Sequence, residues 1–240
     1  MGKLNTLNSL LRKLGFELIK YTPRNNFALS RSKILKNLDI EIILDIGANV
    51  GKFGLELRES GFDGRIYSFE PLSGAFKKLE IASAKDNNWK IFNFAIGDRN
   101  GEFEINVSKN IHSSSFLEMQ DTHLMAAPDS KYISSEKCEV KTLDKVFDDL
   151  KINSNKCYLK IDTQGFEMPV LIGAENILNN FLAIQVELTF QSLYKNQILF
   201  DEIYNYLLNK GYHFVNIEPG FMNEETGELL QIDGVFKKIV

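Results

Sequence analysis

The chain has 240 residues, and its 44% hydrophobic and 25% charged content is typical of a globular protein of one or two domains, which excludes a disordered chain. Its formal net charge of −4 disfavours a duplex nucleic-acid partner, because proteins that bind duplexes carry basic surfaces. Cys138 and Cys157 fit neither a metal motif nor a disulfide framework, which favours a reducing, cytoplasmic location.

The first 30 residues are predicted to be helical, because Leu7, Leu10, Leu11, Leu14 and Leu18 recur at helical spacing. Basic residues accompany them: Lys3, Arg12, Lys13, Lys20 and Arg24. Such a helix can lie on a membrane surface or dock a partner, but we favour a helix packed against its own domain. We expect no transmembrane segment and no signal peptide. We therefore divide the chain into an N-terminal helical segment, residues 1–35, and one domain over residues 36–240.

From residue 41 onward, predicted strands and helices alternate. Strands are predicted at residues 41–46, 65–69, 89–94, 101–107, 156–161, 181–188, 212–217 and 234–239. Helices are predicted at 52–60, 73–84, from 162 through 176 and at 199–208. This alternation predicts an α/β fold with a mostly parallel sheet and helices on both faces. We interpret the strand at 101–107 as an insert, and the serine-rich residues 110–137 as a long loop or lid.

The strongest local signal is the glycine-containing run that follows the first strand, Asp45-Ile46-Gly47-Ala48-Asn49-Val50-Gly51. Glycines at the carboxyl end of a strand permit a tight turn and let the backbone approach a ligand. A dinucleotide site needs Gly-x-Gly-x-x-Gly, and Asn49 replaces its middle glycine here. A carboxylate at Asp45 repels a pyrophosphate but attracts the positive end of S-adenosylmethionine. The run therefore favours S-adenosylmethionine as cofactor, with a turn that binds nothing as the alternative.

Two further segments extend this cofactor site. Glu70, followed by Pro71, ends the second strand about 20 residues after the glycine loop, where an acidic residue commonly binds ribose hydroxyls. The alternative is a surface glutamate at a helix start. The third strand ends Asn93-Phe94-Ala95-Ile96-Gly97-Asp98, which we expect beside the adenine, although a simple turn at Gly97-Asp98 explains the same residues.

Taken in order, these segments resemble the FkbM-type family of S-adenosylmethionine-dependent methyltransferases. The matching segments are the glycine loop, residues 68–71, 93–98 and 140–144, Leu159-Lys160-Ile161-Asp162-Thr163-Gln164-Gly165-Phe166-Glu167, Gly173-Ala174 and Val186-Glu187-Leu188. They cover residues 42–188, and the run that contains Asp162 is the most specific. The resemblance implies a Rossmann-like class I methyltransferase fold with a seven-stranded sheet over residues 36–240.

The resemblance also implies methyl transfer to a hydroxyl of a sugar, glycan or polyketide-like natural product. Many bacterial relatives look associated with the synthesis of surface polysaccharides. The chain departs from the family at Gln164, where a glutamate is frequent, and a neutral amide cannot act as a general base. We therefore exclude that position from proton transfer.

A base that removes the hydroxyl proton would speed such a transfer. The candidates are Asp162 and Glu187, which end neighbouring strands, and His112, whose imidazole titrates near neutrality. A helix cap, an ion pair and simple solvent exposure, respectively, are their structural alternatives. Glu167 fits a structural role better, bonding a backbone N–H or a lysine. Asp162 and Glu187 could hold Mg²⁺, but we predict no metal because no residue set has metal-ligand spacing.

Two other functions compete with this prediction. A nicotinamide-dependent oxidoreductase shares the fold and Glu70, but Asp45 and Asn49 argue against it. A catalytically silent nucleoside-binding module would keep the same loop residues. A DNA methyltransferase is disfavoured because the chain lacks an Asn/Asp-Pro-Pro-Tyr/Phe segment and is acidic. We expect a small-molecule or glycan acceptor and no nucleic acid, and the sequence indicates neither which acceptor nor which oligomeric state.

Overall fold

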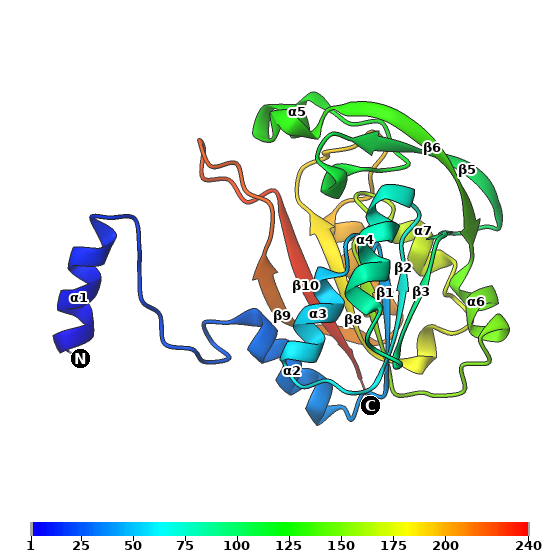
Figure 1. Ribbon diagram of the computed structural model, residues 1–240, viewed down its shortest axis with the longest axis horizontal. Helices are drawn as coiled ribbons and strands as arrows, with labels where there is room; N and C mark the ends of the chain where they lie inside the picture. Colours follow the sequence, from blue (N-terminus) through cyan, green and yellow to red (C-terminus); the bar gives the residue numbers. More distant parts are fainter. Residues whose placement is uncertain (1, 240) are drawn as a thin grey trace.

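The computed structural model describes residues 2–239 and their side chains from Asn5 onward. A seven-stranded sheet has the order β3-β2-β1-β7-β8-β10-β9 (Figure 1). Its strands are β1 (Ile42–Ile46), β2 (Arg65–Phe69), β3 (Trp89–Phe92), β7 (Cys157–Ile161), β8 (Phe181–Thr189), β9 (Tyr212–Pro219) and β10 (Gln231–Lys238). In this sheet, β10 runs antiparallel to the other six strands. The predicted mostly parallel sheet is confirmed.

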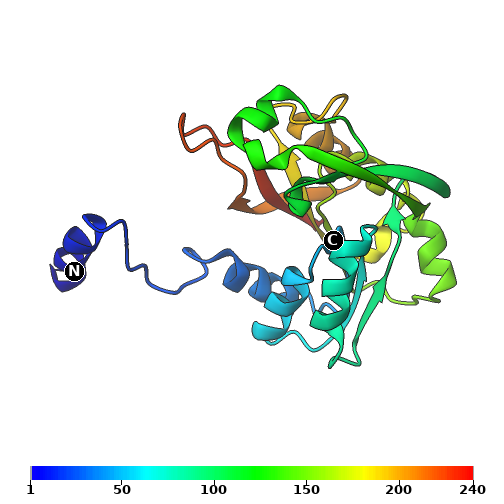
Figure 2. The same cartoon turned by 45° about the horizontal axis from the view of Figure 1, so that its top comes forward.

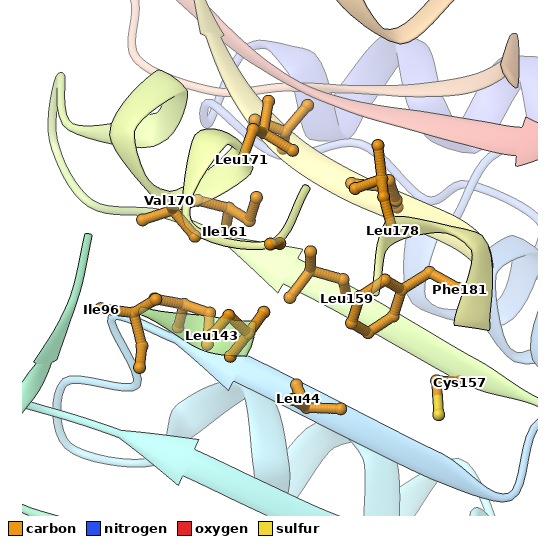
Figure 3. Close-up of a cluster of buried hydrophobic side chains, with 14 of the residues drawn as sticks. Leu44, Ile96, Leu143, Cys157, Leu159, Ile161, Val170, Leu171, Leu178 and Phe181 are labelled. Carbon is orange, nitrogen blue, oxygen red and sulfur yellow. The ribbon is translucent and has the colours of Figure 1, made fainter. Parts of the chain in front are cut away.

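Helices cover both faces of this sheet because its central strands are apolar on both sides. One face packs against α2 (Phe27–Asn37), α3 (Lys52–Glu59) and α4 (Ser73–Ser83). The other face packs against α6 (Leu143–Asp149), α7 (Glu167–Ile172) and α8 (Phe200–Asn209). In Figure 3, Leu143 of α6 lies beside Leu44, and Val170 of α7 lies beside Ile161. Alternate residues of β1 therefore point to different helices, and residue 45 points to the α3 side with Ile43.

A second, three-stranded sheet arches over the carboxyl ends of the main strands (Figures 1 and 2). It joins β4 (Ala95–Ile96), β6 (Tyr132–Lys141) and β5 (Gly101–Ser108), and between β5 and β6 lie η1 (Ile111–Ser113), α5 (Asp121–Ala126) and η2 (Pro128–Ser130). The predicted loop over 110–137 is wrong in its last part, because residues 132–137 belong to β6, which pairs with β5; residues 110–131 form irregular chain with short helices. Most of β6 is solvent-exposed and polar, and only Cys138 and Val140 are buried, so the sequence carries little strand periodicity.

Several predicted boundaries move for local reasons. The strand predicted at 89–94 ends at Phe92, and Ala95 and Ile96 pair with the second sheet instead. The helix predicted to reach residue 176 ends at Ile172 and gives way to turns before η3 (Leu178–Asn180).

The N-terminal helix predicted over the first 30 residues is present only over residues 2–12. The chain forms α1 (Gly2–Arg12), a non-helical stretch, and then α2, which Asn26 caps by accepting the backbone N–H of Leu29 at 2.8 Å. Helix α2 packs on the body, whereas α1 lies apart from it in both views (Figures 1 and 2). Packing of the first helix against its own domain is therefore not observed. Within residues 2–239, no helix combines the length and the apolar character needed to cross a bilayer.

Candidate active site

The turn after β1 depends on glycine at position 47. Gly47 has a φ of +77°, and its N–H donates to the carbonyl oxygen of Phe69 at 3.0 Å. A Cβ built on Gly47 would lie 1.9 Å from the backbone oxygen of Asp162. The loops after β1 and β7 can therefore touch only because residue 47 has no side chain.

Glu70 is buried at the end of β2, yet it contacts no cation directly. Its Oε2 accepts the N–H of Asn49 and its Oε1 accepts the N–H of Leu72, both at 2.8 Å. Burial raises the pKa of Glu70 to about 7 even though both bonds favour the carboxylate. Each carboxylate oxygen keeps a second lone pair, so Glu70 can still accept hydroxyl donors from a ligand.

A cavity of about 280 Å³ opens where the strand ends of the main sheet meet the arching second sheet. Its wall includes eight of the residues singled out from the sequence: Gly47, Asn49, Glu70, Pro71, Ala95, His112, Asp162 and Glu187. Thr163, Gln164, Ile105 and Phe116 also line it. The structure thus brings both predicted groups, for cofactor binding and for catalysis, into one cavity.

Asp45 is not among the wall residues. Its carboxylate is fully buried behind the loop, where Oδ2 accepts the hydroxyl of Ser68 at 3.0 Å and Oδ1 lies 3.4 Å from Nζ of Lys160. Burial raises the pKa of Asp45, and the charge of Lys160 opposes that rise. We expected this carboxylate to face a positively charged donor. The structure instead directs it to the α3 side of the sheet, because residue 45 alternates with Ile46 along β1.

Gly51 and Asn93 also lie outside the cavity wall. Gly51 caps α3 with a φ of +88°, and a Cβ there would meet Leu79 at 2.9 Å. The Asn93 amide donates to the carbonyl oxygens of Glu70 at 2.9 Å and Pro71 at 3.1 Å. Asn93 therefore supports the turn that carries Glu70 and does not itself line the cavity.

At the other end of the cavity, Gln164 joins the two candidate catalytic carboxylates. Its Nε2 lies 3.0 Å from Oδ1 of Asp162 and within 3.1 Å of both oxygens of Glu187. The Tyr194 hydroxyl donates to Oε1 of Gln164 at 3.0 Å, which turns the amide nitrogen toward the carboxylates. Gln164 cannot remove a proton, but it fixes the distance between two groups that can.

Electrostatics distinguish these two carboxylates. Burial raises the pKa of Glu187 well above its ordinary value, and the charges of Asp162 and Glu167 raise it further. Oδ2 of Asp162 forms an ion pair with Nζ of Lys160 at 3.3 Å. Burial alone would lower the pKa of Lys160, but Asp162 and Asp45 outweigh it and keep the ammonium charged. Lys160 thus connects Asp45, behind the glycine loop, to Asp162 in the cavity.

Glu167 and His112 are the remaining candidates, and they lie in different surroundings. Glu167 is buried and accepts the N–H groups of Thr163 at 3.0 Å and Gly165 at 3.1 Å, which confirms its structural role. His112 is solvent-exposed at the rim of the cavity. Within the described residues, no three His, Cys, Asp or Glu side chains are placed to hold a metal ion. The position between Asp162 and Glu187 is taken by an N–H donor, which a cation would have to displace.

Sequence reasoning missed Lys160 and Tyr194. Lys160 did carry a signal, because it is the only charged residue in the buried strand Cys157–Ile161 and such a charge needs a partner. Tyr194 carried none, since its contact with Gln164 joins residues 30 positions apart.

Comparison with known proteins places this architecture among the class I methyltransferases. The chain belongs to the FkbM methyltransferase family, because the model of the methyltransferase FkbM domain matches residues 45–214. The 2-O-methyltransferase NoeI of Sinorhizobium fredii (strain NBRC 101917 / NGR234) is 24% identical over 203 residues, which are 82% of this chain and 83% of that protein.

The solved structure of methyltransferase FkbM from Methylobacillus flagellatus KT is 15% identical, with a TM-score of 0.51. The match covers 83% of this chain and 44% of that one, so this chain spans less than half the length of that protein. At this identity the likeness supports the fold alone.

Proposed function

We propose that the protein is an S-adenosylmethionine-dependent O-methyltransferase that acts on a hydroxyl of a sugar, glycan or related natural product. The observation that carries the proposal is one cavity with a diol-accepting carboxylate, Glu70, at one end and the Asp162–Gln164–Glu187 cluster at the other. Membership of the FkbM family and the likeness to a 2-O-methyltransferase support it.

The residues of the loop fit this cofactor better than a dinucleotide. Asn49 has a φ of +48°, and its own Oδ1 accepts the N–H of Val50 at 2.8 Å. Val50 directly precedes Gly51, the N-cap of α3, so this bond occupies a loop N–H beside the helix N-terminus, where a pyrophosphate would need free donors. Glu70 would hold the ribose hydroxyls, and the apolar Ala95 would lie beside the base. This preference for a nucleoside without a pyrophosphate disfavours the nicotinamide alternative.

S-adenosylmethionine, when bound, supplies an activated methyl group that is transferred from sulfur to an acceptor oxygen. The chain must hold the acceptor hydroxyl in line and take its proton, and positioning alone can lower the barrier by about 7–11 kcal/mol. We assign proton acceptance to Glu187, because its raised pKa gives it high proton affinity once it is ionised. Asp162, whose negative charge is balanced by the ion pair with Lys160, orients the hydroxyl.

Two measurements on the purified full chain test this function. Calorimetric titrations with S-adenosylhomocysteine and with NAD identify the cofactor class, and we expect binding only of the former. Tight NAD binding without a response to S-adenosylhomocysteine would reject the proposal.

Transfer of a labelled methyl group to a panel of hydroxyl-bearing glycans then tests catalysis. We expect label in at least one acceptor and its loss in Glu187→Gln. Binding of S-adenosylhomocysteine with no transfer to any hydroxyl would identify a silent nucleoside-binding module.

A further inference from the structure

The first part of the chain forms a small folded unit of its own. Helix α1 ends at Arg12, the chain turns at Gly15 with a φ of +79°, and residues 16–18 run back along the helix. The buried Asn8 side chain donates to the carbonyl oxygen of Leu18 and accepts its N–H, both at 2.9 Å. We name residues 5–21 the N-terminal hook. Because Asn8 holds its two arms together, the hook presents a defined surface.

That surface is unusually apolar. Among the described side chains of the hook, seven large apolar or aromatic ones are between 44% and 73% exposed: Leu7, Leu10, Leu14, Phe16, Leu18, Ile19 and Tyr21. Single exposed apolar residues are normal, but a group on one short segment marks an interaction site. The sheet domain does not cover these side chains, since the hook lies apart from it (Figures 1 and 2).

Charge is distributed just as unevenly. Residues 1–26 contain five basic residues and one acidic residue, a net charge of +4. The whole chain carries −4, which leaves −8 on residues 27–240. A net positive charge and a cluster of exposed apolar side chains therefore coincide on one protruding segment, while the body that carries the cavity has a net negative charge.

We propose that the N-terminal hook binds the surface of an anionic phospholipid bilayer. Apolar side chains enter the boundary between headgroups and acyl chains while Lys13, Lys20 and Arg24 contact lipid phosphates. The 11-residue helix α1 is too short to span a bilayer, so it lies in the interface. A second copy of the chain is a poorer partner, because most exposed apolar side chains of the body are spread over separate elements from α3 to β9. This inference does not depend on the proposed methyl transfer.

Vesicle flotation with the full chain tests the proposal. We expect the protein to float with vesicles of phosphatidylcholine and phosphatidylglycerol, to bind phosphatidylcholine alone weakly, and to dissociate as salt is raised. Equal binding to both vesicle types, or to neither, would overturn the proposal.

Variants separate the apolar from the electrostatic contribution. Leu10→Ser, Leu14→Ser and Phe16→Ser should each lower the partition coefficient about tenfold, because each removes a side chain that enters the bilayer. The matched controls Ile81→Ser and Ile133→Ser change exposed apolar residues of the body and should leave vesicle binding unchanged.

Each neutralised basic residue in the hook or just after it should lower the partition coefficient about fivefold, the equivalent of about 1 kcal/mol per charge. The neutralisations are Lys13→Gln, Lys20→Gln and Arg24→Gln. The controls, which should have no effect, are Lys77→Gln, Lys78→Gln and Lys85→Gln on the exposed surface of the body. Unchanged thermal unfolding of every variant excludes misfolding. Self-association that the hook variants abolish, without vesicle binding, would assign the hook to a second copy and refute the membrane proposal.

Discussion

Two carboxylates, the buried Glu70 and the half-buried Glu187, stand at opposite ends of the same cavity and are held in different ways. Each oxygen of Glu70 accepts a backbone N–H, so the path of the chain fixes its position. Both oxygens of Glu187 instead lie next to one side-chain amide, that of Gln164, which Tyr194 orients in turn. Burial raises the pKa of both carboxyl groups.

The difference suits two different tasks. A group that binds a constant part of a cofactor gains from a rigid, backbone-made site. A group that gains and loses a proton gains from neighbours that tune its proton affinity. Gly47 packs against the backbone of Asp162, between the two ends of the cavity. A substitution at residue 47 can therefore disturb both ends.

Gly47→Ala should have the largest effect. Its Cβ would overlap a backbone oxygen that no rotamer change can move, and its φ of +77° disfavours any side chain. We expect a loss of more than about 3 kcal/mol in the free energy of unfolding and no detectable S-adenosylhomocysteine binding.

Gly61→Ala is the matched control for this change. Gly61 has a similar φ of +87°, but no atom lies within 4 Å of its added Cβ. We expect a cost of about 1–2 kcal/mol from the backbone alone and unchanged ligand binding. Denaturant titration and calorimetry compare the two variants. Equal losses in both would show that the contact between the loops is not critical.

Glu187→Gln tests the other end of the cavity, where the carboxylate is expected to take the proton of the acceptor. We expect methyl transfer to fall about 10²–10⁴-fold while S-adenosylhomocysteine affinity stays nearly constant. Since a base must be ionised, the wild-type rate should rise with pH through the raised pKa of Glu187, and the variant should lose this rise.

The control for this prediction is Glu167→Gln, in which another buried carboxylate with a raised pKa is replaced. Glu167 accepts backbone N–H groups and does not line the cavity, so its loss should lower stability. The pH-dependent limb should remain but move to lower pH, because the charge of Glu167 no longer raises the pKa of Glu187. A Glu187→Gln enzyme with an unchanged pH profile would remove Glu187 from proton transfer.

The sequence predicts the site unevenly, for physical reasons. Gly47 and Glu70 are recognisable because turn geometry and strand ends are local properties, encoded within a few residues. Asp45 was expected to contact the cofactor, yet its partner is Lys160, 115 positions later, and only the pairing of β1 with β7 brings them together. The orientation of the Gln164 amide between Asp162 and Glu187 likewise depends on Tyr194, which follows β8.

The fold shows the same limit. The buried strands of the main sheet are apolar runs that the sequence reveals. Strand β6 is exposed and polar, so its sequence shows little strand periodicity. It is stabilised by pairing with β5. The exposed β6 was therefore missed, whereas the strands buried on both faces of the main sheet were found.

Gln164→Leu should have a smaller effect than Glu187→Gln. The variant keeps the volume of residue 164 but removes the N–H donor that holds Asp162 and Glu187, and misplaced catalytic groups cost about 10²-fold. The ionised form of Glu187 loses a hydrogen bond, so its pKa should rise and the pH-dependent limb should move to higher pH. Tyr194→Phe leaves the amide donor in place and removes the hydroxyl's contacts with Gln164 and with the carbonyl oxygen of Ser113, so it should shift the limb less. A lower rate with an unmoved limb would reduce Gln164 to a packing role.

The smallest effect should come from Glu70, at the end of the cavity that the backbone holds in place. Protonation of this carboxyl group should be linked to the stability of the protein and to ligand affinity. Its folded-state pKa of about 7 lies above the ordinary value of 4.5, so the folded protein holds a proton that the unfolded chain releases between these values. Its contribution to stability is therefore full below pH 4.5 and is lost as pH rises through 7. Ligand affinity should change in the opposite direction, because ribose hydroxyls need the ionised carboxylate.

We expect S-adenosylhomocysteine to bind about tenfold more weakly one pH unit below that pKa. Binding there should release a proton from Glu70, visible as a dependence of the calorimetric enthalpy on the buffer. Glu70→Gln, which cannot ionise, should bind weakly at every pH and remove this part of the pH dependence of unfolding. The decisive measurement is the wild-type affinity between pH 6 and 8 at fixed salt. A constant affinity would mean that the ligand does not use the ionised form of Glu70. The two carboxylates would then differ in geometry alone.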